Sequence, residues 1–178
     1  TCKGEGFVAP ASRRPIEDDT GGSHGTIGLD DALKYSCNQY FAQMGLKLGA
    51  ARLAQVAQRF GIETGAARDL RDTDLWHHSP LADHTDFVSA FGPPPSRVFL
   101  PPTFDDDFTP YSLAIESFGQ GPNQMTMLQL ALLAAGAASA DGRLNRPSIE
   151  LGLEPEALGQ VCTPETAAHI RRMMKSVV

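Results

Sequence analysis

The sequence predicts a mainly helical fold that occupies one domain, or one large subdomain, of 178 residues. Apolar residues recur at helical spacing in several separate runs. Residues suited to capping precede most of those runs. Only two short stretches, 6–9 and 146–151, favour β-strands. With 42% hydrophobic and 20% charged residues, the chain has the ordinary composition of a globular protein with a core.

The first 28 residues carry little periodicity, so we expect coil with one short strand around residues 6–9. A short helix follows, because Asp30 and Asp31 would lie in its first turn, where carboxylates favour the positive end of the helix dipole. That helix should end near Tyr35.

Ser36 and Gln39 have the spacing of a capping box, which predicts that the next helix starts at Ser36. Gly49 should end it. Another helix follows and should end at Gly61, a residue suited to the position after a helix. Its predicted apolar stripe consists of Leu53, Val56, Ala57 and Phe60.

Residues 62–113 are rich in proline and are expected to form an extended loop covering one face, with aromatic residues that need a place to pack. These aromatic residues are Trp76, Phe87, Phe91, Phe99 and Phe104.

Three elements complete the prediction. Thr126 and Gln129 form a second capping-box pattern before a helix that is apolar almost all round, and such a helix is normally buried. The turn signal Asp141-Gly142 precedes the expected strand at 146–151. Thr163 then caps a last helix that begins with proline.

The three cysteines are Cys2, Cys37 and Cys162. An odd number excludes complete internal pairing. Low cysteine density in a chain with enough core favours three thiols, while a Cys2–Cys37 disulfide remains open in an oxidising compartment. No Cys-x-x-Cys or Cys/His pair has zinc spacing, so we expect no metal and no other cofactor.

The motif Ser36-Cys37-Asn38 stands between two predicted helices, and Ser-x-Asn alone is a weak signal that a helix cap would also explain. Further motifs follow it in a fixed order along the chain. The ordered set is His24-Gly25, Ser36-Cys37-Asn38, Tyr40-Phe41, Leu48-Gly49, Phe60-Gly61, Phe118-Gly119-Gln120-Gly121 and Met125-Thr126. This set resembles the transpeptidase domain of class B penicillin-binding proteins, of the penicillin-binding protein A type. The resemblance covers nearly the whole chain.

The resemblance implies a serine-type peptidoglycan D,D-transpeptidase that crosslinks stem peptides in cell-wall synthesis and cell division and is acylated by β-lactams. It implies the all-helical half of that fold, with most of the five-stranded sheet missing. Ser36 and Asn38 match the Ser-x-Asn motif and are the expected catalytic residues. The Ser36 hydroxyl would pass a proton to the leaving amine, and the Asn38 amide would hold the catalytic lysine and a substrate carbonyl.

Two motifs that this chemistry needs are absent from the sequence. No serine has lysine three residues later, and no Lys-Thr-Gly or Lys-Ser-Gly is present, since Lys175-Ser176 is followed by Val177. We expect both motifs to lie beyond the ends of the chain, so that residues 1–178 are the part of the domain between them and are inactive alone. A D,D-carboxypeptidase or β-lactamase-like hydrolase, and a degenerate, non-catalytic helical interaction domain, are the alternatives.

The expected partners are peptidoglycan stem peptides and β-lactams. Nucleic acid is excluded, because the net charge is −6 and no basic stripe stands out. The parent protein is expected to act outside the cytoplasmic membrane, anchored by an N-terminal helix. Helices without their sheet would expose an apolar face, so self-association of the fragment is also expected.

Overall fold

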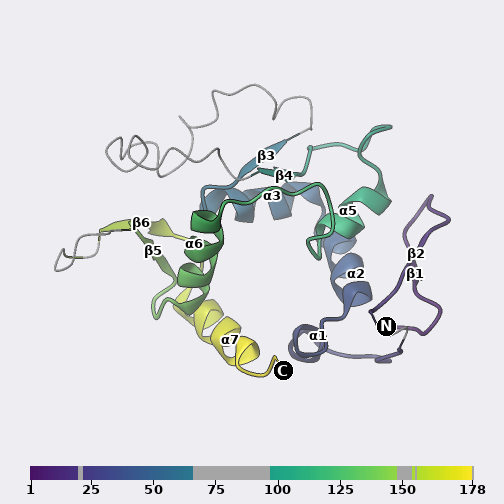
Figure 1. Cartoon of the computed structure of the whole chain (residues 1–178), viewed down its shortest axis with the longest axis horizontal. Coiled ribbons are helices and arrows are strands. Elements are labelled where there is room, and N and C mark those ends of the chain that lie inside the picture. Colours follow the sequence, from purple (N-terminus) through teal and green to yellow (C-terminus); the bar gives the residue numbers. More distant parts are fainter. Residues whose placement is uncertain (20–21, 66–96, 148–153, 155, 178) are drawn as a thin grey trace. The chain divides into compact units, whose positions relative to one another are not determined.

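The computed structural model describes residues 1–19, 22–65, 97–147, 154 and 156–177. In this part of the chain lie six helices and six short strands (Figure 1), which confirms the mainly helical prediction. The helices are α1 (Leu29–Lys34), α2 (Asn38–Leu48), α3 (Ala50–Arg59), α5 (Pro110–Glu116), α6 (Met127–Ala138) and α7 (Pro164–Met174). The strands are β1 (Phe7–Val8), β2 (Pro15–Ile16), β3 (Glu63–Gly65), β4 (Arg97–Phe99), β5 (Arg143–Asn145) and β6 (Ala157–Gln160).

The chain divides into two compact units. The first contains Thr1–Ala54, Phe99–Asn123 and Met173–Val178, and the second contains Gln55–Val98 and Gln124–Arg172. No helix in the described ranges is both long enough and apolar enough to cross a membrane.

The first unit is built on the packing of α2 against α5 (Figure 1). Gly45 permits this close approach, because a Cβ at that position would lie 1.6 Å from Ser117 Oγ. Strands β1 and β2 form an antiparallel hairpin with Phe7 opposite Ile16. The hairpin and the two helices share one core cluster, whose buried members are Ala9, Ile16, Ala42 and Ala114.

The second unit is built on the antiparallel hairpin of β5 and β6, beside α6. Gly142 allows the turn before β5, since it has a φ of 76° and its carbonyl accepts the Val161 amide at 2.9 Å. The buried Gln129 side chain of α6 donates to the Phe60 carbonyl at 2.7 Å. The apolar cluster of this unit is centred on Leu132, Leu144 and Val161.

The predicted strand at residues 6–9 is confirmed by β1, but its partner β2 was not predicted. Of the predicted strand at 146–151, only Arg146 and Pro147 are described, and neither belongs to a strand, because β5 ends at Asn145. Pro147 has no N–H for a ladder hydrogen bond, so pairing ends before it. Residues 148–153 lie outside the described part of the chain.

The extended loop predicted for residues 62–113 is also wrong in part. Strands β3 and β4 pair with each other inside it, and α5 begins at Pro110 behind a capping box of Thr109 and Ser112. Phe108 is fully buried, and Phe99 packs on it edge to face at 5.2 Å. Residues 66–96, with Trp76, Phe87 and Phe91, lie outside the described residues.

The two helices whose threonine caps were predicted, α6 and α7, begin as expected. Thr126 accepts the Gln129 amide at 3.1 Å and Thr163 accepts the Thr166 amide at 3.2 Å. The prediction that the apolar α6 is buried all round is wrong, since Met127 is 81% exposed and Leu130 is 47% exposed. Only one side of α6 faces the hairpin cluster.

Candidate functional site

Ser36 lies in the turn between α1 and α2, and it ends the first helix rather than beginning the second. The Cys37 amide donates to the Ala32 carbonyl at 2.9 Å, and the Ser36 amide donates to the Leu33 carbonyl at 3.1 Å. These two bonds form a Schellman motif that closes α1 behind its C-cap residue, Tyr35. The predicted capping box of Ser36 is therefore wrong, because the N-cap of α2 is Cys37.

The backbone of Ser36 is left-handed, with a φ of 50°. The position after the C-cap in a Schellman motif usually holds glycine, because a side chain in this conformation costs free energy. Ser36 is exposed, so burial of its side chain does not offset that cost. Strained non-glycine residues of this kind concentrate at functional sites.

Asn38 is the first residue of α2 and is partly buried. One N–H of its side-chain amide donates to the Glu17 carbonyl at 3.1 Å. This bond fixes the amide against the segment after β2 and leaves its carbonyl oxygen and a second N–H available for other partners. The fold thus holds both predicted site residues on a single turn, two positions apart.

The next residue, Gln39, is buried and binds the N-terminal segment to this turn. Its side-chain carbonyl accepts the Lys3 amide at 3.0 Å, and its side-chain N–H donates to the Lys3 carbonyl at 2.7 Å. The capping role predicted for Gln39 is replaced by this two-point contact with the backbone of Lys3.

Four side chains with metal-binding atoms meet directly behind the turn, and the sequence analysis did not predict this cluster. The members are Cys2, Asp18, His24 and Cys37, with ligand atoms that all lie within 4.8 Å of one another. Both cysteines are buried thiols whose Sγ atoms contact Asp18 Oδ2, at 2.8 Å from Cys2 and 3.5 Å from Cys37. The only sequence signal was the presence of these four possible ligands, of three residue types, between positions 2 and 37.

The electrostatics of this cluster follow from its burial. Burial raises the pKa of the Cys37 thiol to about 12. Burial also pushes the pKa of Asp18 upward, but hydrogen bonds from Cys2, Cys37 and backbone amides outweigh it and lower that pKa below its ordinary value. Asp18 is therefore held as a buried carboxylate beside the neutral thiol of Cys37.

The Gly119-Gln120-Gly121 segment follows α5 and has a structural explanation for both glycines. Gly119 has a φ of 84°, and Gly121 lies directly against the carboxylate of Glu116. Glu116 is only 7% exposed, and burial raises its pKa to about 7. The lone carboxylate belongs to the packing of this loop.

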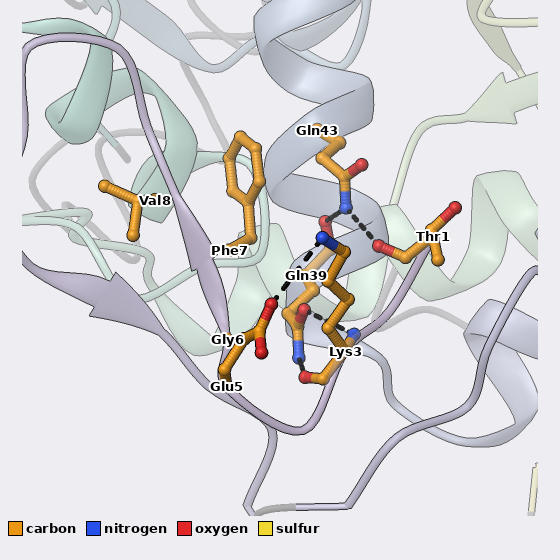
Figure 2. A pocket seen from close by; sticks show the side chains of 8 residues that line it. All are labelled: Thr1, Lys3, Glu5, Gly6, Phe7, Val8, Gln39 and Gln43. Carbon is orange, nitrogen blue, oxygen red and sulfur yellow. Dashed lines mark hydrogen bonds and ion pairs between the residues drawn. The ribbon is translucent and has the colours of Figure 1, made fainter.

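A pocket of about 390 Å³ opens between the N-terminal segment and α2 (Figure 2). Figure 2 shows Lys3 and Glu5 paired across it, with Nζ and Oε1 3.6 Å apart, and Gln43 donating to the Thr1 carbonyl. Its lining residues are Thr1, Lys3, Glu5, Gly6, Phe7, Val8, Gln39 and Gln43. Neither Ser36 nor Asn38 lines this pocket, so it carries none of the expected chemistry.

A curated relative matches almost the whole of this chain. Peptidoglycan D,D-transpeptidase PbpA of Mycolicibacterium smegmatis is 26% identical over 188 residues, which is 94% of this chain and 33% of that protein. The chain therefore spans about a third of the length of this curated relative.

Solved structures show the same fold. The crystal structure of PBPA from Mycobacterium tuberculosis has a TM-score of 0.69 at 22% identity, and covers 97% of this chain and 37% of its own. The imipenem acyl-enzyme complex of penicillin-binding protein A from the same organism has a TM-score of 0.70 at 22% identity, over 96% of this chain and 36% of its own.

A family model described as the penicillin binding protein transpeptidase domain matches residues 9–178. This match includes the turn with Ser36 and Asn38, the Gly119–Gly121 loop and the capped helices α6 and α7. The chain therefore belongs to the penicillin-binding protein transpeptidase domain family.

Proposed function

We propose that this chain is the portion of a serine D,D-transpeptidase that lies between its Ser-x-x-Lys and Lys-Thr-Gly motifs. The whole protein would crosslink peptidoglycan stem peptides and be acylated by β-lactams. Family membership and the D,D-transpeptidase activity for which the Mycolicibacterium smegmatis relative is named support this assignment. The observation that carries it is Ser36, an exposed serine in a left-handed position that would otherwise favour glycine.

In this proposal Ser36 and Asn38 have different roles in the acyl transfer. A serine supplied by the Ser-x-x-Lys motif attacks the stem-peptide carbonyl, and its proton passes through a neutral lysine. The Ser36 hydroxyl hands a proton to the leaving amine as the peptide bond breaks. Asn38 positions the lysine and the substrate carbonyl through its side-chain carbonyl oxygen and second N–H, which its bond to Glu17 leaves available.

The chain alone should be inactive, because its sequence contains neither a Ser-x-x-Lys nor a Lys-Thr-Gly or Lys-Ser-Gly motif. Met127 and Leu130 of α6 are apolar and exposed. Their exposure supports the idea that another element of the whole protein, or a second copy of the chain, covers this side of α6. We accordingly propose that the chain alone self-associates. From the family assignment, we also propose that the parent protein works at the outer face of the cytoplasmic membrane with an N-terminal anchor.

The test is covalent labelling of the protein, extended at both ends to its natural termini, by a fluorescent penicillin, with intact mass as the readout. We expect one adduct per chain, lost when the Ser-x-x-Lys serine is replaced by alanine. Turnover of a stem-peptide mimic with an acceptor amine then separates crosslinking from hydrolysis by a carboxypeptidase or β-lactamase. A folded, extended chain that forms no adduct would be a non-catalytic helical domain.

Ser36→Gly is the matched variant for the role of Ser36. Glycine suits the left-handed backbone, so the fold is kept while the hydroxyl is removed. We expect acylation of Ser36→Gly to be slowed by about 100-fold or more, the range that a positioned proton donor supplies. Unchanged acylation would return Ser36 to the role of a simple helix terminator.

A further inference from the structure

We propose that Cys2, Asp18, His24 and Cys37 form a zinc site that ties the N-terminal segment to the turn carrying Ser36 and Asn38. The binding of metal is independent of the proposed transpeptidase function. Its consequence for catalysis rests on that function, because Cys37 lies between the two proposed catalytic residues in the sequence.

The spacing of the ligand atoms fits a tetrahedral ion. Metal–ligand bonds of about 2.0 to 2.3 Å place neighbouring ligand atoms of such a site roughly 3.3 to 3.8 Å apart. The cluster has three separations in this range: Cys2 Sγ to His24 Nδ1 at 3.4 Å, Cys37 Sγ to Asp18 Oδ2 at 3.5 Å, and His24 Nδ1 to Asp18 Oδ2 at 3.4 Å. Cys2 Sγ to Asp18 Oδ2, at 2.8 Å, is shorter, which is a thiol–carboxylate hydrogen bond that a metal would replace. The two remaining separations, from Cys37 Sγ to Cys2 Sγ and to His24 Nδ1, are within 4.8 Å.

The donor set selects zinc. Two thiolates, one imidazole and one carboxylate give a four-coordinate site, with no position left open for substrate. Thiolate ligands disfavour magnesium and calcium, which take oxygen donors. On binding, both thiols lose their protons to solvent, and the two thiolates and one carboxylate carry three negative charges against the two positive charges of the ion.

The groups around the four side chains already orient them. The backbone amide of Gln39 donates to Asp18 Oδ1 at 3.4 Å, so that Oδ2 faces the sulfurs. The His24 amide points at Cys2 Sγ at 3.4 Å, an arrangement that would stabilise a thiolate. The His24 ring also stacks on Tyr35 with ring centroids 5.3 Å apart. These contacts hold the ligands in place from three separate segments.

A disulfide between Cys2 and Cys37 is the competing state, and it would leave part of the cluster unexplained. It would use only the two sulfurs, and Asp18 would remain a carboxylate that is 6% exposed beside an imidazole. A zinc ion would use all four groups as ligands and bind the Asp18 carboxylate directly, while the net charge of the cluster stays at −1. The cluster thus favours metal over oxidation.

The test measures zinc in the full-length protein purified under reducing conditions, by elemental analysis per chain. We expect about one equivalent, retained by Cys162→Ser and lost by Cys37→Ser and Asp18→Asn. Cys162 is a matched control, since it is a free thiol outside the cluster. Chelation should lower the melting temperature of wild type and Cys162→Ser alike.

Cobalt provides a readout that needs no variant to fold. Co²⁺ added to metal-free wild-type protein should give intense thiolate charge-transfer bands and the visible spectrum of a tetrahedral ion, both removed by excess Zn²⁺. A folded protein that takes up neither ion, or one that carries a Cys2–Cys37 disulfide and no metal, would overturn the proposal. Penicillin labelling is scored separately, so loss of acylation with zinc retained counts only against the proposed function.

Discussion

The carboxylate of Glu116 lies directly against the backbone of Gly121, so a Cβ built at Gly121 would be 1.8 Å from Oε1 and 2.1 Å from the carboxyl carbon. The Gly119-Gln120-Gly121 pattern therefore has a packing cause in this chain. The second glycine makes room for a buried acid, and the first supplies the left-handed turn with its φ of 84°.

Gly121→Ala should destabilise the protein by about 1–3 kcal/mol, because the loop or the Glu116 side chain must move to admit a methyl group. Chemical denaturation measures the change. Gly159→Ala is the control, since a Cβ there would have no atom within 4 Å, and its effect should stay within about 0.5 kcal/mol. Equal effects of the two variants would contradict the packing role of Gly121.

Glu116 should make stability depend on pH. Its pKa is about 7 in the folded protein against an ordinary 4.5, so the folded state keeps a proton that the unfolded state has released between these values. The contribution of Glu116 to the free energy of unfolding should therefore be highest below pH 4.5 and fall as pH rises toward 7. The slope from this group should stay below about 1.4 kcal/mol per pH unit, because folded and unfolded states can differ by at most one proton on it.

Denaturation midpoints at pH 5, 6, 7 and 8 test this dependence. Glu116→Gln keeps the shape of the side chain but cannot ionise, so it should flatten the fall and be more stable than wild type at pH 8. Glu5→Gln removes an exposed carboxyl and should leave the slope of wild type unchanged. A slope that survives in Glu116→Gln would assign the pH dependence to another group.

Local signals in the sequence were enough to predict most of the helices. Thr126 and Thr163 cap their helices as their spacing indicated, because the cap and its N–H partner are three residues apart. Ser36 shows the limit of such signals. The same spacing matched a capping box, but the Cys37 and Ser36 amides bond back to α1, and tertiary packing of Ala32 and Cys37 selects that alternative.

The candidate site was predicted only in its local part. Ser36 and Asn38 are two residues apart, so any turn there would place them together. Cys2, Asp18 and His24 approach Cys37 only through the N-terminal hairpin and the bridge that pairs Cys2 with Gly25. The spacing of such ligands depends on long-range contacts and matches no sequence pattern, so the sequence analysis expected no metal.

Ser36→Gly should stabilise the protein even though it removes a proposed catalytic group. The variant gains stability because glycine has no strain in the left-handed conformation, and it loses some because glycine has more conformational entropy in the unfolded chain. The net effect should be about 0.5–1 kcal/mol in favour of the variant. Ser36→Ala keeps the strain and should not stabilise. A glycine variant that is less stable than the alanine variant would show that the Ser36 backbone carries little strain.

The approach of α2 to α5 depends on Gly45. A Cβ at that position would lie 1.6 Å from Ser117 Oγ and 2.4 Å from Ser117 Cβ. A side chain at position 45 would therefore require the two helices to separate or the side chain of residue 117 to be removed. Gly45→Ala should therefore cost about 1–3 kcal/mol, beyond the gain in helix propensity that alanine brings.

Ser117→Gly should rescue this loss, because it removes both of the atoms that a methyl group at position 45 would meet. Ser117 is the C-cap of α5, with a φ of −68°, so the single change has its own cost of about 1 kcal/mol at most. In a double-mutant cycle by chemical denaturation, the two changes should couple favourably by about 1 kcal/mol or more. Additive costs would mean that the α2–α5 contact adapts by other movements, and Gly45 would then matter only through its weak helix propensity.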